Sequence, residues 1–237
     1  MSNNSRGSIL VTGASSGIGL GICKKLLKEG NSVTGLSRTI KHAQLDHPNF
    51  TAMACDLSDF EQTGKQIKQL LKSGPSIYGA VFCAGSGYFG KLEQLNFKKI
   101  EAVMTLNLLS PMFLSKLLIP YFKGQGKGRL IFLGSEAALQ GSKNGTAYCA
   151  SKFGLRGFVQ ALSAESRQAG INISLINPGM VDTPFYDNLH FKPGEDESNR
   201  IPVQAIADCV YSLLEADSNA VIEEINLSPR NRVVAFK

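Results

Sequence analysis

The stretch Thr12-Gly13-Ala14-Ser15-Ser16-Gly17-Ile18-Gly19 decides the fold. It follows an apolar run at 9–12 and opens a helical pattern at 17–29. Gly13 permits a tight turn, Gly17 lets the backbone approach a pyrophosphate, and Gly19 lets the helix pack against the strand. The helix N-terminus then presents free N–H groups and the positive end of its dipole. Glycines are also common in purely structural turns, but in a first strand–helix turn they indicate a dinucleotide site.

Outward from this loop, short β-rich runs alternate with longer helical patterns. Apolar strands separated by helices predict a parallel sheet covered on both faces, with its ligand crevice at the carboxyl ends of the strands. We predict one α/β domain over residues 1–237, a doubly wound (Rossmann) parallel sheet of about seven strands with helices on both faces. The expected strands lie at 9–12, 32–37, 50–56, 80–84, 130–135, 172–177 and 221–227, and the expected helices at 17–29, 59–72, 97–122, 146–169 and 202–216.

The segment 180–201 interrupts this alternation. It has no clear periodicity and contains Pro184 and Pro193. A long irregular stretch inside a domain is usually a functional lid or a disordered loop. Its aromatic residues, among them Phe185 and Tyr186, favour a lid over the substrate.

Composition excludes several function classes. The chain has 237 residues, 43% of them hydrophobic, and a net charge of +6 that is not gathered into any run of five like charges. Together with the lack of a binding motif, this gives no indication of nucleic-acid binding. The five cysteines form no C-x-x-C pair, and the three histidines show no ligand spacing, so we predict no metal site. A glycine loop without a Gly-Lys-Ser/Thr ending disfavours nucleotide hydrolysis.

The location of the protein follows from the same composition. Residues 1–7 show no signal-peptide pattern, and the apolar region 103–122 is interrupted by polar residues and reads as a core helix. Scattered cysteines among apolar neighbours are typical of a reduced, intracellular protein. We expect a cytoplasmic protein with no membrane partner.

The second expected strand ends in Leu36-Ser37-Arg38-Thr39, without an acidic residue. An acid here would bind a free ribose 2′-hydroxyl, whereas the Arg38 guanidinium suits a 2′-phosphate, with Ser37 as a hydrogen-bond donor. NADP(H) is therefore predicted over NAD(H). Asp56, at the end of the third strand, has two equal interpretations: contact with the adenine amino group, or capping of the next helix.

Three side chains form the expected catalytic group. Ser135 ends the fifth strand, Tyr148 follows thirteen positions later, and Lys152 lies four residues beyond it. Residues i and i+4 share one face of a helix, so Tyr148 and Lys152 project together. The ammonium should lower the pKa of the phenol by roughly 1–3 units from about 10, and Ser135 can hold the substrate oxygen.

With these residues the chain resembles the short-chain dehydrogenase/reductase family, of the compact, non-extended type. The matching positions, in family order, are Thr12-Gly13-x-x-x-Gly17-x-Gly19, Asp56, Ala84-Gly85, Asn107, Ser135, Tyr148-x-x-x-Lys152 and Pro178-Gly179-x-x-x-Thr183. The resemblance implies that Asn107 completes a catalytic tetrad by holding a water linked to Lys152. It also implies that Lys152 binds the nicotinamide ribose. The backbone of Val181 and the residue Thr183 are expected to contact the carboxamide side of the cofactor.

The expected binding residues extend beyond these positions. Cofactor contacts are expected from Gly13, Ser15, Ser16, Gly17, Ile18, Gly19, Ser37, Arg38, Asp56, Leu57, Cys83, Ala84, Gly85, Tyr148, Lys152, Pro178, Gly179, Val181 and Thr183. Substrate contacts are expected from Ser135, Tyr148, Tyr88, Leu139, Phe185 and Tyr186. No carboxylate-binding arginine is evident among the expected walls of the substrate pocket, and Arg156 and Arg167 should lie outside it, which favours a largely apolar carbonyl substrate.

Two departures from the family pattern stand out. Cys83 replaces the usual Asn before Ala84-Gly85, and the last strand lacks the glycine-rich ending of the resembling β-ketoacyl-carrier-protein reductases. The second departure argues against a role in fatty-acid synthesis.

The sequence therefore predicts an NADP(H)-dependent oxidoreductase that interconverts a carbonyl and an alcohol on a small substrate. The alternative from another class is a non-catalytic NADP(H)-sensing regulator, which would not need the intact Ser135, Tyr148 and Lys152.

The segments 97–122 and 146–169 are apolar on more than one face. Such helices need cover on two sides, and the resemblance implies a homodimer or homotetramer through them.

Overall fold

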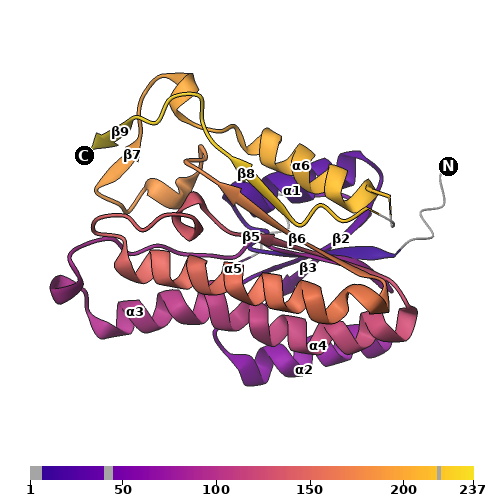
Figure 1. Ribbon diagram of the computed structural model, residues 1–237. Coiled ribbons are helices and arrows are strands. Elements are labelled where there is room, and N and C mark those ends of the chain that lie inside the picture. Colours follow the sequence, from indigo (N-terminus) through magenta and orange to yellow (C-terminus); the bar gives the residue numbers. More distant parts are fainter. Residues whose placement is uncertain (1–6, 40–44, 218–219) are drawn as a thin grey trace.

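Seven parallel strands form the central sheet (Figure 1) in the order β3-β2-β1-β4-β5-β6-β8. The structure is a computed structural model, and it describes residues 7–39, 45–217 and 220–237. The sheet confirms the predicted doubly wound arrangement, because every ladder within it is parallel. Its strands are β1 Ser8–Thr12, β2 Ser32–Ser37, β3 Phe50–Ala54, β4 Ile77–Phe82, β5 Gly128–Leu133, β6 Ile171–Pro178 and β8 Glu224–Leu227.

Helices cover both faces of the sheet, and a separate hydrophobic core lies under each layer (Figure 1). On one face lie α1 (Gly17–Lys28) and α6 (Val203–Glu215), which pack against each other. On the other face lie α2 (Phe60–Ser73), α3 (Phe97–Met104), α4 (Ser110–Gln125) and α5 (Thr146–Ser166). All five residues of β1 are buried, as expected for a strand covered on both sides.

The strand order reverses between β1 and β4. The chain runs from β1 outward to β3, then crosses back to β4 and continues to the other edge. Loops that leave neighbouring strands in opposite directions open a crevice at their carboxyl ends. The fold therefore places a ligand crevice where the glycine loop begins.

The predicted helix at 97–122 is divided. A π-helical turn, Thr105–Leu109, separates α3 from α4, and the Ser110 hydroxyl donates to the carbonyl oxygen of Thr105. The continuous stretch Phe97–Gln125 is long and apolar enough to cross a membrane by length and composition alone. In the structure, Leu114, Leu118 and Phe122 of this stretch are buried in the core beside the sheet.

Some boundaries and one small sheet differ from the prediction. β4 begins at Ile77 rather than 80, and β8 begins at Glu224 rather than 221. A separate antiparallel pair joins β7 (Phe191–Pro193), inside the segment 180–201, to β9 (Val234–Phe236). Strands of three residues are too short to show a period of two, so sequence periodicity could not reveal them.

Candidate active site

The glycine loop joins β1 to α1 at the crevice. Gly13 and Gly17 have φ angles of +70° and +52°, in the left-handed region that favours glycine. A Cβ on Gly19 would lie 2.2 Å from the carbonyl oxygen of Gly13, so a side chain there would push the helix off the loop. Bare backbone and the start of α1 thus face the pocket, an arrangement that fits a pyrophosphate.

The end of β2 approaches this loop from one side. The Ser37 hydroxyl donates to Ser15 Oγ at 2.8 Å, and the exposed Arg38 follows it into the pocket wall. Asp56 accepts hydrogen bonds from the backbone N–H and the hydroxyl of Ser58 at 3.0 and 2.6 Å. These bonds lower the pKa of Asp56, and the nearby charge of Arg38 lowers it further.

The capping interpretation of Asp56 is wrong. The N-cap of α2 is Asp59, whose carboxylate accepts from the backbone N–H of Gln62 at 2.9 Å. Asp56 instead holds the turn before the helix. Its adenine interpretation remains a prediction.

The structure brings Ser135, Tyr148 and Lys152 together. Ser135 directly follows the loop after β5, and the other two lie on one face of α5, with Lys152 Nζ 5.8 Å from the centroid of the Tyr148 ring. Lys152 is only 6% exposed and donates to the carbonyl oxygen of Leu133 at 2.9 Å. Ser135 is within hydrogen-bond range of Tyr148, and this hydrogen bond acts to lower the pKa of the phenol.

The electrostatics of this group differ from the expectation. Burial raises the pKa of Tyr148 to about 12, although hydrogen bonding from Ser135 opposes the rise. Burial also lowers the pKa of Lys152 to about 8. The predicted fall in the phenol pKa is therefore not found in the protein without ligands, because removing the phenolate from water outweighs the other effects.

Asn107 is held by protein groups behind the pocket rather than in its wall. It lies in the π-helical turn, where Oδ1 accepts from the Ser86 N–H and Nδ2 donates to the Ser86 carbonyl, both at 2.9 Å. Nδ2 also lies 3.0 Å from Ser151 Oγ. Whether Asn107 holds a water stays a prediction.

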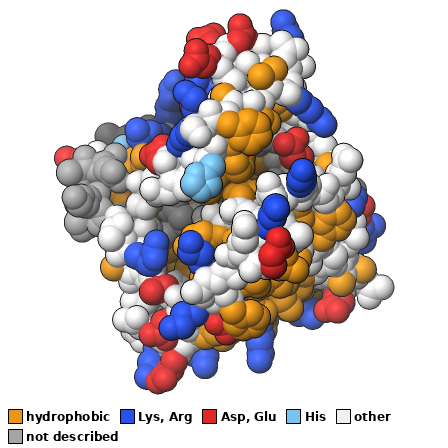
Figure 2. Space-filling model, turned by 90° about the vertical axis from the view of Figure 1, so that its left-hand side faces the viewer, with side chains coloured by type: hydrophobic (Ala, Val, Ile, Leu, Met, Phe, Trp, Pro, Cys, Tyr) orange, Lys and Arg blue, Asp and Glu red, His pale blue; other side chains and the backbone are white. Residues whose placement is uncertain are grey.

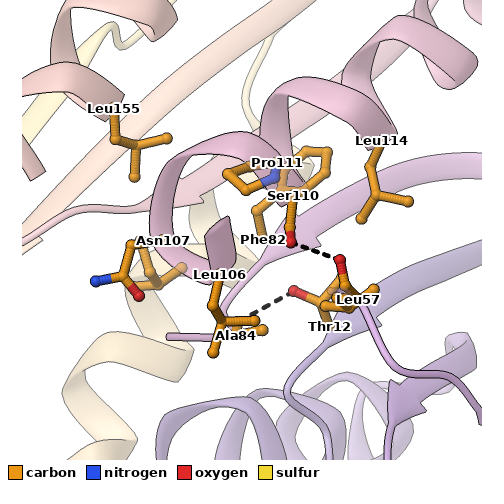
Figure 3. A pocket seen from close by; sticks show the side chains of 11 residues that line it. Thr12, Leu57, Phe82, Ala84, Leu106, Asn107, Ser110, Pro111, Leu114 and Leu155 are labelled. Carbon is orange, nitrogen blue, oxygen red and sulfur yellow. Dashed lines mark hydrogen bonds between the residues drawn. The ribbon is translucent and has the colours of Figure 1, made fainter. Parts of the chain in front are cut away.

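Beside Asn107 lies a small cavity of about 10 Å³ (Figure 3). Thr12 and Ser110 contribute its hydroxyls. Ser110 donates to the Leu57 carbonyl at 2.7 Å, and Thr12 Oγ1 accepts from the Ala84 N–H at 3.1 Å. This space suits at most one water and no larger ligand.

A much larger pocket of about 1350 Å³ opens at the carboxyl ends of the strands. Figure 2, which looks onto this end, shows hydrophobic side chains through the middle of the face, with Lys and Arg side chains around them. All the predicted cofactor and substrate residues line this one pocket, and of the predicted catalytic residues only Asn107 does not. Among the described residues no group of three His, Cys, Asp or Glu side chains could hold a metal.

Five aromatic rings form a closed chain of contacts over the catalytic group. Phe89 contacts Tyr148 and Phe191, Tyr186 contacts Phe191 and Phe185, and Phe185 returns to Tyr148, with centroid distances of 4.9–6.0 Å. We call these five residues the aromatic ring cluster. They come from three separate parts of the sequence, and they help to explain why Tyr148 is shielded from water.

The last residues of the sequence run along the segment 180–201. Besides the β7–β9 ladder, Gly194 N–H donates to the Val233 carbonyl, and Lys237 N–H donates to the His190 carbonyl, both at 2.9 Å. Lys237 Nζ donates to the carbonyls of Tyr186 and Asp187 at 2.6 and 3.0 Å. The 231–237 tail therefore holds this segment at the mouth of the pocket.

Sequence reasoning missed three charged residues of the pocket, Glu136, Lys143 and Arg232. Arg232 lies in the pocket, where no arginine beyond Arg38 was expected, and it belongs to the 231–237 tail that pairs with the segment 180–201. Arg156 and Arg167 are paired with Glu224 and Glu223 outside the pocket, as expected. For Glu136, the one signal in the sequence was its position directly after Ser135.

Comparisons with known proteins agree with this geometry. A family model described as short chain dehydrogenase matches residues 8–192. An uncharacterized oxidoreductase of Staphylococcus epidermidis is 28% identical over 93% of this chain and 96% of its own length. The 3-oxoacyl-(acyl-carrier-protein) reductase of Buchnera aphidicola is 30% identical over 90% of this chain and 87% of its own.

A solved structure extends the likeness to the whole fold. The alcohol dehydrogenase of the archaeon Thermococcus sibiricus, complexed with 5-hydroxy-NADP, superimposes with a TM-score of 0.83. It is 25% identical, and the match covers 95% of this chain and 98% of that one.

Proposed function

The chain belongs to the short-chain dehydrogenase family and is an NAD(P)-dependent oxidoreductase, and we propose that it interconverts a carbonyl and an alcohol on a small substrate. The observation that carries this proposal is the meeting of Ser135, Tyr148 and Lys152 in the pocket that also contains the glycine loop. The alternative of a non-catalytic sensor has no support in the comparisons.

A bound nicotinamide dinucleotide supplies the hydride in the direction of reduction. Tyr148 gives its proton to the carbonyl oxygen, and the Ser135 hydroxyl holds that oxygen by a hydrogen bond. Lys152 binds the ribose and, when protonated, stabilises the phenolate left on Tyr148. Burial raises the pKa of Tyr148 to about 12, so the phenol is protonated at neutral pH and can act as the proton donor in reduction.

NADP(H) is the proposed cofactor. The glycine cradle accepts a pyrophosphate, and the wall at Ser37 and Arg38 offers a hydroxyl and a free guanidinium to a 2′-phosphate. In the described residues Arg38 has no ion-pair partner that would compete with such a phosphate. Asp56, with its low pKa, is proposed to accept from the adenine amino group.

The segment 180–201 is proposed as a substrate lid. Its base is closed by the Val181–Ile201 bridge, and its far part carries Phe185, Tyr186 and Phe191 over Tyr148. Tyr88 and Leu139, which are partly exposed, are proposed to contact the substrate at the pocket entrance. We do not propose an acyl-carrier-protein substrate, although the Buchnera relative is named for one, because β8 and the residues after it lack the glycine-rich ending.

A homodimer or homotetramer through α4 and α5 is proposed for the assembly. Leu109, Met112 and Phe153 on the outer faces of these helices are 38–44% exposed. Exposed apolar side chains on a helix pair indicate a covered surface.

The test of the proposed function is the variant Tyr148→Phe. It removes only the hydroxyl, so we expect turnover of a panel of ketones and aldehydes with NADPH to fall by roughly 10²–10⁴-fold, the usual contribution of a general acid. NADPH binding, measured by fluorescence titration, should stay within a factor of about two to three. Tyr211→Phe on α6, away from the pocket, is the matched control. Unchanged turnover in Tyr148→Phe would contradict the mechanism.

A further inference from the structure

Glu136 places a carboxylate next to the catalytic serine. It begins the short turn after Ser135, is half-buried and lines the large pocket. Its Oε2 lies 3.0 Å from the position that a Cβ on Gly179 would take. The carboxylate is therefore directed toward the end of β6, inside the pocket rather than out to bulk solvent.

This carboxylate has no hydrogen-bond or ion-pair partner among the described side chains and N–H groups. Four cations line the pocket, Arg38, Lys143, Lys152 and Arg232, and none of them forms an ion pair with Glu136. Lys152 instead donates to the Leu133 carbonyl at 2.9 Å, and Arg232 donates to Ser228 Oγ at 2.8 Å. A half-buried charge without a partner is costly, and in a ligand pocket it is poised for a group on the ligand.

The negative charge of Glu136 acts electrostatically on Tyr148, the proposed proton donor. It contributes to raising the pKa of both Tyr148 and Tyr186, so the carboxylate lies within electrostatic range of the proton donor and of one wall of the aromatic ring cluster. A cation bound to Glu136 would thus lie close to the carbonyl that Tyr148 protonates.

The aromatic ring cluster adds a second cation-binding feature. Its five rings, whose neighbouring centroids lie 4.9–6.0 Å apart, all line the pocket, and a cation within ~6 Å of a ring face is attracted to it. Gly87 backs the cluster, since a Cβ there would clash with Phe89 and Phe185 at 2.6 and 2.7 Å. Aromatic rings with one carboxylate are the combination that recognises ammonium groups.

We infer that the substrate is an amino ketone, whose protonated amine is bound by Glu136 beside the aromatic ring cluster while Ser135 and Tyr148 engage its carbonyl. This inference rests on the proposed function and names its substrate class. The amine takes no part in the reaction: the carbonyl gains a hydride at carbon and the Tyr148 proton at oxygen, the nicotinamide is oxidised, and an amino alcohol leaves.

The test compares two ketones of similar shape, 2-amino-1-phenylethanone and propiophenone, which differ by an ammonium in place of the terminal methyl group of the side chain. At slightly acidic pH, with saturating NADPH, we expect kcat/KM for the amino ketone to exceed that for propiophenone by at least about tenfold, as for a charge-assisted hydrogen bond. Glu136→Gln should remove most of this ratio, chiefly through KM of the amino ketone. Glu165→Gln, on the exposed side of α5, should change neither value.

The ratio separates recognition from a general effect on Tyr148, because altered proton transfer would change both ketones equally. A wild-type ratio near one, or an equal loss for both ketones in Glu136→Gln, would overturn the inference. Either result leaves the proposed function standing, since propiophenone is still reduced, and only the Tyr148→Phe experiment addresses that function.

Discussion

Lys152 shows at the residue scale how burial and chemistry compete. Its ammonium is held by one carbonyl in an enclosed site, where its pKa falls to about 8. The common face of Tyr148 and Lys152 could be read from helical spacing, because i and i+4 lie on one face, and Ser135 from its place at the end of a strand. The pKa of Tyr148 could not, because Phe89 and Phe185, which shield it, come from distant parts of the chain.

The low pKa of Lys152 predicts a pH-dependent stability difference. Unfolded lysine keeps its proton up to its ordinary pKa of 10.5, whereas folded Lys152 releases it above about 8. The cost of the buried charge is thus fully present below pH 8 and disappears as the pH rises to 10.5. Lys152→Met should therefore be more stable than the wild type at pH 7, by up to on the order of 2–3 kcal/mol, and lose this advantage toward pH 10.

Urea unfolding at the two pH values measures this difference. Lys116→Met, an exposed lysine of α4 changed in the same way, is the control. The loss of the hydrogen bond to Leu133 reduces the gain at both pH values by the same amount, so the change between them is the decisive quantity. A difference that does not vary with pH would contradict the assignment.

At the scale of elements, the sheet and its helices follow from the sequence, whereas the internal structure of the proposed lid at 180–201 does not. Continuous apolar strands and long helical patterns are strong signals. The segment 180–201 contains only short turns and the three residues of β7, and its order depends on β9, about forty residues later. The sequence did not reveal the π-helical turn either, because one extra residue in a helix hardly alters its apolar pattern.

Shortening the 231–237 tail should loosen the lid. A chain ending at Arg232 loses the β7–β9 ladder and the bonds from Lys237, while the Val181–Ile201 bridge at the base of the lid remains. We expect KM for the carbonyl substrate to rise by about tenfold, the equivalent of about 1.4 kcal/mol, with little change in NADPH affinity. Steady-state kinetics and NADPH titration measure the two effects.

Lys237→Ala serves as the graded control, because it removes the side-chain bonds to the lid but leaves the ladder in place. Its KM should lie between those of the wild type and the shortened chain. If the shortened chain keeps the wild-type KM, the tail does not hold the lid.

At the scale of the whole molecule, a cofactor bound at the carboxyl end of the sheet should raise the free energy of unfolding of the whole fold. The pocket touches residues from the first strand to the tail, so a ligand that fills it stabilises the native chain as a unit. The fold class and the cofactor edge of this pocket were predictable from order and spacing. The charges of Glu136 and Arg232 in the pocket needed the structure, because no periodic pattern marks them.

Thermal melting should therefore distinguish the two cofactors. A ligand at one hundred times its Kd adds about 2.7 kcal/mol, which for a chain of this size is a rise in Tm of several degrees. At equal concentrations NADP+ should give the larger rise than NAD+, because Arg38 can bind the 2′-phosphate. Arg38→Asp should abolish the preference. A larger rise with NAD+ in the wild type would refute the cofactor assignment.

The pairing of β9 with β7 also bears on how this protein can be handled (Figure 1). Ser8 opens β1 at the amino end of the sheet, whereas Lys237 lies at the opposite end, beside the entrance used by substrates. An affinity tag fused after Lys237 would crowd that entrance and strain the pairing. A tag joined to the chain upstream of Ser8 would precede the amino end of β1, away from the entrance, and it is the better choice for purification and kinetic work.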